Sequence, residues 1–501
     1  MEEKRSRLGF IRSFPRTFWL ANVMELFERG AYYGLNALLA RYLTDKVGGG
    51  LGFAEDRVGL LQGVVYAVTY VVPILGGALA DRYGYRRMLL AAFSLLSAGY
   101  FISGEVTGYG VIFVTLLLMA TGSGLFKPII SGTIARTTDE ETSSFGFGLY
   151  YWMINLGALV APLVAGWLRG FSWRYVFIAS GIYCALMILP TLFLYRDPPK
   201  PESTMKLRKV LSGALTVLSD ARFMLLIFVY SCFWIIYFQN FGTVLWYLRD
   251  FIDPTPVNSF FARIGIEGFR FDAEHVTVIN AGTIVLLQIF VNIIVKRFKA
   301  LPTMVAGILI GSMGFLCLAL SQYAWIFILG MAIFSIGEMT CHPKYYSYIG
   351  LVAPEDKKAV YMGYAFLYGV IGSLVGSNVG GEMYKAFLNP LVGQSGAGGT
   401  LRNFWLVFSL LGVVTMFGLM LYNRLFGEDT PATRLRARKV MYFIYILLIV
   451  CSIAILVLVS EISPKTWIQA GIMFFVGLGG LYTMIKSRSG AGNNEPDNQL
   501  E

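Results

Sequence analysis

The sequence predicts an all-α integral membrane protein. Of its 501 residues, 56% are hydrophobic and only 14% are charged, and the mean hydropathy is +0.63. A water-soluble domain cannot bury so large a share of apolar surface. The apolar residues also recur in segments of about 20, which is the length of helix that crosses a bilayer.

These segments follow one another in a pattern of six, six and two, which predicts fourteen spanning helices. They lie at roughly 17–43, 58–80, 88–104, 109–134, 144–168, 173–195, 222–250, 274–297, 301–321, 324–350, 359–386, 403–426, 440–460 and 465–486. We therefore expect an N-terminal six-helix bundle at 1–195, a cytosolic amphipathic linker at 196–221, a C-terminal six-helix bundle at 222–427, an additional two-helix hairpin at 428–486 and a disordered tail at 487–501.

The distribution of basic residues predicts the orientation. The formal net charge is +11, but the lysines and arginines are scattered among short loops and are richer on one side of the predicted membrane. This bias places both termini in the cytosol, and the polar N-terminal tail has no cleavage-site pattern. We expect a multi-pass protein of the cell (plasma or inner) membrane that works as a monomer, with the lipid bilayer and not nucleic acid as its partner.

Three charged residues stand within five positions of the first apolar segment, in ELFERGAYYG at residues 25–34. Glu25, Glu28 and Arg29 share one helix face, and each unpaired charge at mid-membrane costs roughly 2.5–3.5 kcal/mol. They must therefore neutralise one another or face a wet cavity. One interpretation is an ion-pair clip that only holds helices together; the other is a functional site, to which Lys127 is the natural partner.

Other kinds of site have little support in the sequence. The five cysteines lie in separate apolar segments without a CxxC pattern, and the two histidines are far apart. No phosphate-binding loop, HExxH pattern or nucleophile arrangement is present. We expect no metal, no cofactor apart from protons as the coupling ion, and no enzymatic activity.

Several motifs, taken in order, resemble one known family. The loop GGALADRYGYRR at 76–87 resembles the hallmark loop of the major facilitator superfamily, which here contains Asp81, Arg82, Arg86 and Arg87. ELFERGAYYG, GSGLFKP at 122–128, FGFGLYYWMINLGALVAPLVAGW at 145–167 and GEM at 337–339 are similar to motifs of the proton-coupled oligopeptide transporter (POT/PTR) family. The resemblance covers about residues 17–426.

This resemblance implies a major facilitator fold of two six-helix bundles with a central site that opens to either side in turn. It implies proton coupling for Glu25, Glu28, Arg29 and Lys127. It implies substrate contacts at Tyr32, Tyr33, Asn36, Tyr70, Lys127, Asn155, Phe238, Gln239 and Glu338. The function expected is symport of small peptides or peptide-like compounds with protons. The alternative is a carrier of a non-peptide organic anion or metabolite, an exporter included.

Two positions depart from the family pattern. Asn36 stands where the family often has an arginine that binds the substrate carboxylate, and Phe238 stands where it often has an acid that pairs with that arginine. Because both the arginine and its partner acid are absent here, neither leaves the other as an unpaired buried charge. The two extra helices also follow the second bundle, whereas fourteen-helix bacterial members usually carry them between the bundles. A receptor or scaffold on the same fold is disfavoured, because it would gain nothing from the buried charges.

Overall fold

The computed structural model describes residues 14–139, 142–198, 213, 216–354, 357–394, 396, 398–458 and 464–491. The first bundle contains α2 (Arg16–Thr44), α3 (Glu55–Tyr83), α4 (Tyr85–Ser103), α5 (Tyr109–Arg136), α6 (Ser143–Arg169), α7 (Trp173–Leu186) and α8 (Ile188–Phe193). Within the described ranges the chain forms helices and no strand, which confirms the predicted all-α class.

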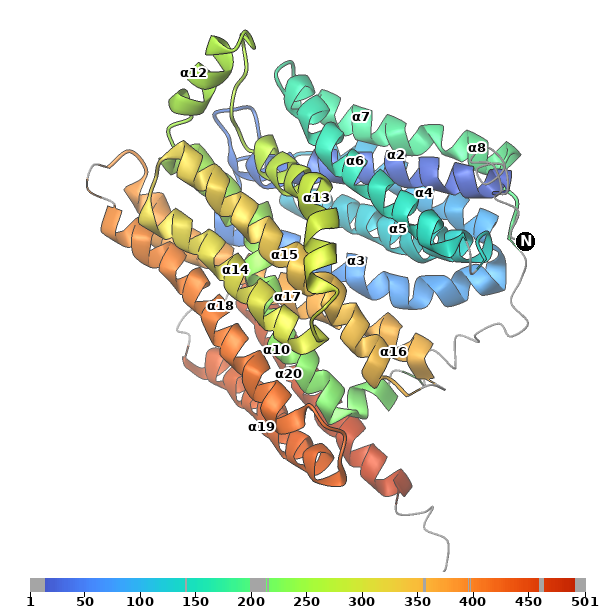
Figure 1. The fold of residues 1–501 in the computed structure, drawn as a ribbon. Coiled ribbons are helices and arrows are strands. Elements are labelled where there is room, and N and C mark those ends of the chain that lie inside the picture. Colours follow the sequence, from blue (N-terminus) through green and yellow to red (C-terminus); the bar gives the residue numbers. More distant parts are fainter. Residues whose placement is uncertain are drawn as a thin grey trace, which may run out of the picture.

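The second bundle begins at α10 (Ala221–Tyr237), which continues through the 3₁₀ turn η1 (Phe238–Phe241) into α11 (Thr243–Phe251). It goes on with α12 (Thr255–Arg263), α13 (Glu274–Val295), α14 (Ala300–Leu320), α15 (Ala324–Val352), α16 (Lys358–Tyr364), α17 (Leu367–Met383), the turns η3 (Tyr384–Leu388) and η4 (Asn389–Leu391), and α18 (Gly398–Phe426). The bundles lie side by side in Figure 1, and α12 projects at one end.

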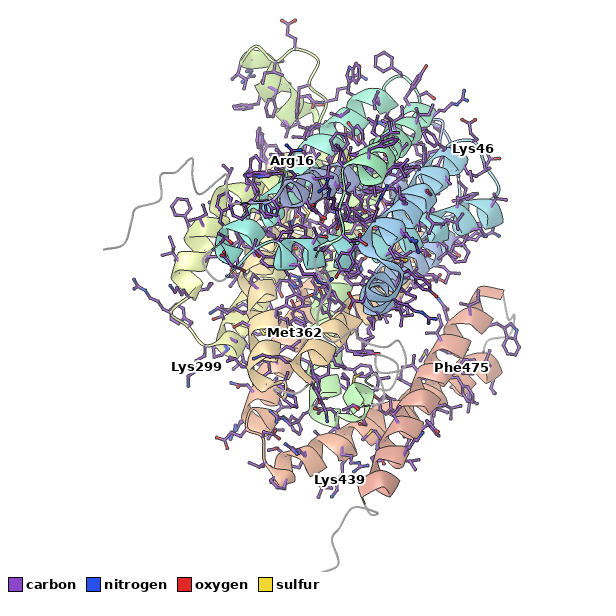
Figure 2. All side chains as sticks on the ribbon, turned by 90° about the vertical axis from the view of Figure 1, so that its right-hand side faces the viewer. Arg16, Lys46, Lys299, Met362, Lys439 and Phe475 are labelled. Carbon is purple, nitrogen blue, oxygen red and sulfur yellow. The ribbon has the colours of Figure 1, made fainter. Side chains whose placement is uncertain are left out.

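The terminal pair, α19 (Pro431–Leu458) and α20 (Pro464–Ala491), packs on the outside of the second bundle. α19 contacts α10 and α18, and the two helices of the pair contact each other (Figure 1). In Figure 2 the side chain of Phe475 points away from both bundles, and it is 73% exposed. The pair also reaches α17, where Gln469 of α20 donates to the Asn378 side-chain oxygen at 3.3 Å.

The predicted spans agree with the helices to within a few residues at most ends. Twelve helices of the described residues are long and apolar enough to cross a membrane. The helices α2 and α4 are not among these twelve, because their charged residues lower their mean hydropathy. They nevertheless pack within the first bundle, α2 beside α6 and α4 beside α5. Counting these two gives the fourteen predicted. The largest difference is the start of α19, at Pro431 and not near 440; smaller ones are the start of α18 at Gly398 and the end of α20 at Ala491.

Three predicted spans are broken in the structure. The sixth is interrupted after Leu186, because Pro190 has no N–H for the Leu186 carbonyl. The seventh breaks at Gly242, between η1 and α11, and the eleventh between α16 and α17. Most of the predicted linker, 199–212 with 214 and 215, and the tail from 492 onward lie outside the described residues.

Glycines allow a close helix approach between α14 and α15. A Cβ atom on Gly337 of α15 would meet main-chain atoms of Gly311 and would lie 2.6 Å from the Gly307 oxygen, both on α14. Because these neighbours are backbone atoms, they cannot move aside without separating the helices.

We predict that Gly337→Ala destabilises the protein by about 1–3 kcal/mol through overpacking. Thermal unfolding of the purified protein measures this. Gly350→Ala on the same helix is the matched control, because a Cβ there meets nothing within 4 Å. Equal melting temperatures for the two variants would contradict the packing argument.

Candidate functional site

The charged residues of α2 form one buried cluster with α5. The exposed fractions of Glu25, Glu28 and Arg29 are 1%, 0% and 4%. Arg29 forms ion pairs with Glu28 and, at 3.5 Å, with Glu25 one helical turn away. Ser123 of α5 donates to Glu28 at 2.8 Å and accepts from Arg29 at 3.1 Å. The cluster therefore ties α2 to α5.

The two glutamates of the cluster are not equivalent. Both oxygens of Glu28 are engaged, one by Ser123 and the other by Arg29. Glu25 pairs with Arg29 through Oε1 only. Its Oε2 is buried without a hydrogen-bond partner in the described part of the chain, with Tyr150 of α6 as a polar neighbour. The less satisfied carboxylate is thus Glu25.

The rings of α2 continue the cluster toward the second bundle. The guanidinium carbon of Arg29 lies 5.0 Å from the ring centre of Tyr32 and 5.9 Å from that of Tyr33. The two rings meet edge to face at 5.2 Å. A cation near an aromatic ring is attracted by it, so the two tyrosines also stabilise the position of the arginine.

Lys127 does not pair with an acid of α2, and this expectation is wrong for this structure. Its ammonium group lies 5.5 Å from the ring centre of Tyr70 on α3. Among the described residues it forms no ion pair, because Arg29 occupies the place expected for it. Lys127 is therefore a half-buried cation over an aromatic ring.

Tyr70 stands where the two bundles meet. Its ring lies within about 6.5 Å of the rings of Trp234 and Phe238, and of Phe366 and Tyr368 at the start of α17. Tyr70 belongs to the first bundle and the other four rings to the second. The structure thus joins the predicted residues Tyr70, Phe238 and Lys127 in one aromatic region.

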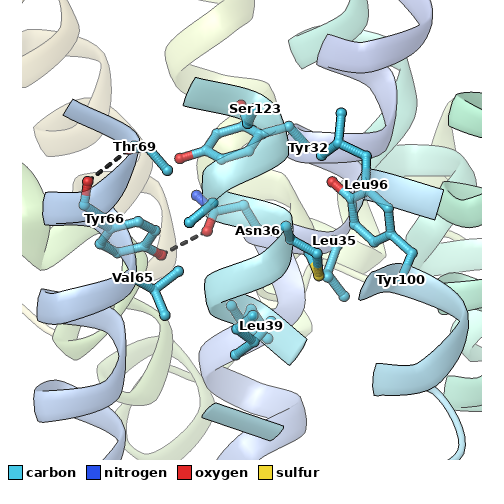
Figure 3. Close-up of a pocket in the computed structure, with 13 residues that line it drawn as sticks. Tyr32, Leu35, Asn36, Leu39, Val65, Tyr66, Thr69, Leu96, Tyr100 and Ser123 are labelled. Atoms are coloured by element: carbon cyan, nitrogen blue, oxygen red, sulfur yellow. Dashed lines mark hydrogen bonds between the residues drawn. The ribbon is translucent and has the colours of Figure 1, made fainter. Parts of the chain in front are cut away.

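Asn36 and Phe238, the two positions that depart from the family pattern, both contact Tyr66, a residue that the sequence analysis did not single out. Tyr66 donates to the Asn36 side-chain oxygen at 2.6 Å, and its ring stacks on Phe238 at 5.3 Å. Gln62 donates to the Tyr66 hydroxyl at 3.1 Å and to the Phe241 carbonyl at 2.9 Å. A neutral chain of hydrogen bonds therefore connects the bundles where the family often has an ion pair. Figure 3 shows the small cavity beside it.

The remaining predicted substrate contacts occupy different surroundings. Glu338 accepts from Asn280 of α13 at 2.9 Å, so its carboxylate is held by a neutral amide. Asn155 donates to the Tyr151 carbonyl of its own helix at 2.8 Å. The Gln239 amide donates to Ile235 and Gly376 carbonyls and accepts from Thr243, which fixes α10 to α17. Their part in binding stays a prediction.

The predicted conformational loop connects α3 to α4 through Gly84, whose φ of +94° favours glycine. Asp81 accepts from Arg136 of α5 at 2.7 Å. The main-chain N–H of Arg86 donates to Asp197 at 2.7 Å, and its guanidinium donates to the Leu192 carbonyl. Arg82 lies over the Tyr83 ring, and Arg87 is exposed.

At the opposite end of the bundles, ion pairs cross between them. Asp272, just before α13, binds Arg41 of α2 and Arg169 of α6, the latter at 2.8 Å. Lys385 of η3 pairs with Asp56 of α3 at 3.2 Å. The sequence signalled none of these pairs, because Arg41 and Asp272 are 231 positions apart. Ser123 could have been predicted as a site residue from the sequence, since it lies one helical turn before Lys127.

We predict that Tyr66→Phe lowers the free energy of unfolding by about 1–3 kcal/mol, because the buried Asn36 oxygen loses its donor while the ring stack remains. Denaturation of the purified protein measures the loss. Tyr109→Phe is the control, because its hydroxyl bonds the Arg57 carbonyl at an exposed position. Equal effects of the two variants would show that the neutral chain adds nothing to stability.

Comparison with known proteins agrees with the fold. Dipeptide and tripeptide permease B of Aliivibrio fischeri is 33% identical over 189 residues, which is 36% of each chain. Multidrug resistance protein MdtH of Aeromonas hydrophila is 24% identical over 77% of this chain and 90% of its own. A POT family transporter solved with 5-aminolevulinic acid superposes with a TM-score of 0.66 at 20% identity, over 84% of this chain and 98% of that one.

The similarity to curated peptide transporters is confined to part of their length. The first three curated relatives match over 33–36% of their own chains. The family model of the Major Facilitator Superfamily, in contrast, matches residues 18–377 and thus runs from the first turn of α2 into α17. The chain belongs to the Major Facilitator Superfamily.

Proposed function

We propose that the chain is a proton-coupled symporter that moves small peptides or peptide-like compounds across the cell membrane by alternating access. The observation that carries this proposal is the buried cluster of Glu25, Glu28 and Arg29, which faces the aromatic region around Tyr70 and Lys127. Such a cluster is costly in a membrane and is of use to a protein that changes its charge state. The partial similarity to peptide permeases supports the cargo.

Glu25 is the proton carrier in this account. Its Oε2 takes no part in the ion pair with Arg29 and has Tyr150 as a polar neighbour, so a proton can be added there without breaking an ion pair. Adding a proton to Glu28 would instead compete with Ser123 or Arg29. A protonated Glu25 no longer attracts Arg29, which loosens the arginine for rearrangement with Lys127 and a substrate anion.

The orientation follows from the charge bias, with both termini in the cytosol. The ion pairs around Asp272 and Asp56 then lie at the outer face and hold the bundles together there. Protons and cargo would enter from outside after these pairs open, and both would leave on the cytosolic side. The carrier needs no covalent step and works as a single chain.

The charged groups of the site suit a zwitterionic substrate, but the protein holds the substrate carboxylate less strongly than a site with arginine would. Lys127 on one bundle and Glu338 on the other offer opposite charges, and aromatic rings lie between α3 and α10. Asn36 cannot form the charge-assisted bond that an arginine would. A non-peptide organic anion or metabolite is the second candidate cargo, favoured by this neutral position and by the long match to a multidrug resistance protein.

We predict that Glu25→Gln abolishes uphill, pH-driven accumulation in proteoliposomes and leaves counterflow exchange largely intact. The amide imitates the protonated acid, so the carrier still changes conformation but no longer carries a proton. Both assays use the same liposomes, with a peptide library as substrate.

Glu28→Gln is the matched variant, with the same chemical change one turn away on the same helix. We expect it to reduce both pH-driven accumulation and counterflow exchange, because it weakens the cluster that positions Arg29. Accumulation against a gradient by Glu25→Gln would exclude Glu25 as the coupling acid. Absence of any peptide uptake by the wild type would instead favour the second cargo.

We also predict tolerance of peptides with an amidated C-terminus. One missing charge-assisted contact should weaken the binding of the free carboxylate about tenfold to a hundredfold relative to a site with arginine. Competition between amidated and free peptides against one labelled substrate measures this. A strict need for the free carboxylate would contradict it.

A further inference from the structure

A polar pocket lies where the terminal pair joins the second bundle. It is formed by the start of α10, the end of α15, α16, the end of α18 and the start of α19. The charged residues that line it are Asp220, Arg222, Asp429, Arg434 and Arg438. None of them belongs to the candidate site, and the pocket lies at the end of the bundle that we place in the cytosol.

Two arginines share one carboxylate in this pocket. Arg222 and Arg434 each approach Asp429 at 2.7 Å. The hydrogen bonds from Arg434 lower the pKa of Asp429 to about 2, so the carboxylate is ionised at any physiological pH. Asp220 is occupied in another way, since it caps the first N–H groups of α10 and accepts from Tyr361. The arginines therefore outnumber the carboxylates available to them.

The guanidinium of Arg222 is only partly engaged: Nη1 pairs with Asp429 at 2.7 Å and Nη2 lies 3.5 Å from the Gly427 carbonyl. Its side chain is 11% exposed, and its Nε is buried without a hydrogen-bond partner among the described residues. Arg438 donates to the Met484 carbonyl of α20 at 2.5 Å, and thus lines the pocket while bridging the terminal pair. A buried donor without an acceptor is unfavourable, and a guanidinium is well suited to a phosphate group.

The residues around this pocket are basic on one side and apolar on the other, as expected for a site at the membrane surface. The segment TRLRARK at 433–439 has four basic residues and no acid, and Lys439 projects at the edge of the molecule in Figure 2. Next to it, Val440 and Phe443 of α19 and Leu421 of α18 expose apolar side chains. A basic pocket that continues into an apolar helix surface is typical of headgroup binding by anionic lipids.

We propose that this pocket binds the phosphate of an anionic phospholipid headgroup, with Arg222 and Arg434 as its main donors. The bound lipid would fill the junction between α18, α19 and α10 and hold the terminal pair on the second bundle. Free phosphate has the same chemistry and could occupy the same donors, but it lacks the acyl chains that the exposed apolar surface would cover.

The test is native mass spectrometry of the full-length, delipidated protein titrated with phosphatidylglycerol, phosphatidylcholine or inorganic phosphate. We expect one phosphatidylglycerol to bind at least about tenfold more tightly than phosphatidylcholine, and inorganic phosphate to compete only weakly. Arg434→Gln and Arg222→Lys should each weaken phosphatidylglycerol binding about tenfold. The lysine retains the charge but loses the planar fork.

Arg436→Gln is the matched control, because it removes the same charge two residues away at an exposed position that does not line the pocket. It should change binding less than about twofold, and thermal unfolding verifies that every variant is folded. An equal loss with Arg436→Gln would mean diffuse attraction to a basic surface. Equal affinity for phosphatidylcholine, or binding of inorganic phosphate as tight as that of the lipid, would also overturn the proposal.

Discussion

The guanidinium group of Arg29 is the constraint on which the candidate site depends. It lies inside a membrane helix, contacts two carboxylates of its own helix and one hydroxyl of α5, and is covered by two tyrosine rings. Each of these charges alone would cost roughly 2.5–3.5 kcal/mol in the bilayer. Removing the arginine would leave two buried carboxylates without their ion-pair partner, so the helix can hold its acids only because the arginine is there.

The charges divide into two groups with different consequences. The interior cluster stays within the first bundle, whereas the ion pairs at the end of α2 cross from one bundle to the other. Between these levels the bundles meet through rings and through small residues, such as Gly63 against Ser373. A contact of rings and small residues with a charged rim lets the bundles separate at one end without breaking an interior ion pair.

Much of this could be predicted from the sequence, because spanning length and helical spacing are local properties. They placed the helices and put Glu25, Glu28 and Arg29 on one face. They could not tell which neighbouring helix each side chain meets, so Lys127 was expected beside an acid and instead lies over Tyr70. The convergence of Asn36 and Phe238 on Tyr66 likewise depends on three separate helical segments.

The most direct measurement of the central claim is infrared difference spectroscopy of the protein in lipid as the pH is lowered. The account predicts that a protonated carboxylic acid band appears in the wild type and is lost in Glu25→Gln, while Glu338→Gln retains it. A band that persists unchanged in Glu25→Gln would show that another acid takes up the proton, and the charged helix would then be a structural clip.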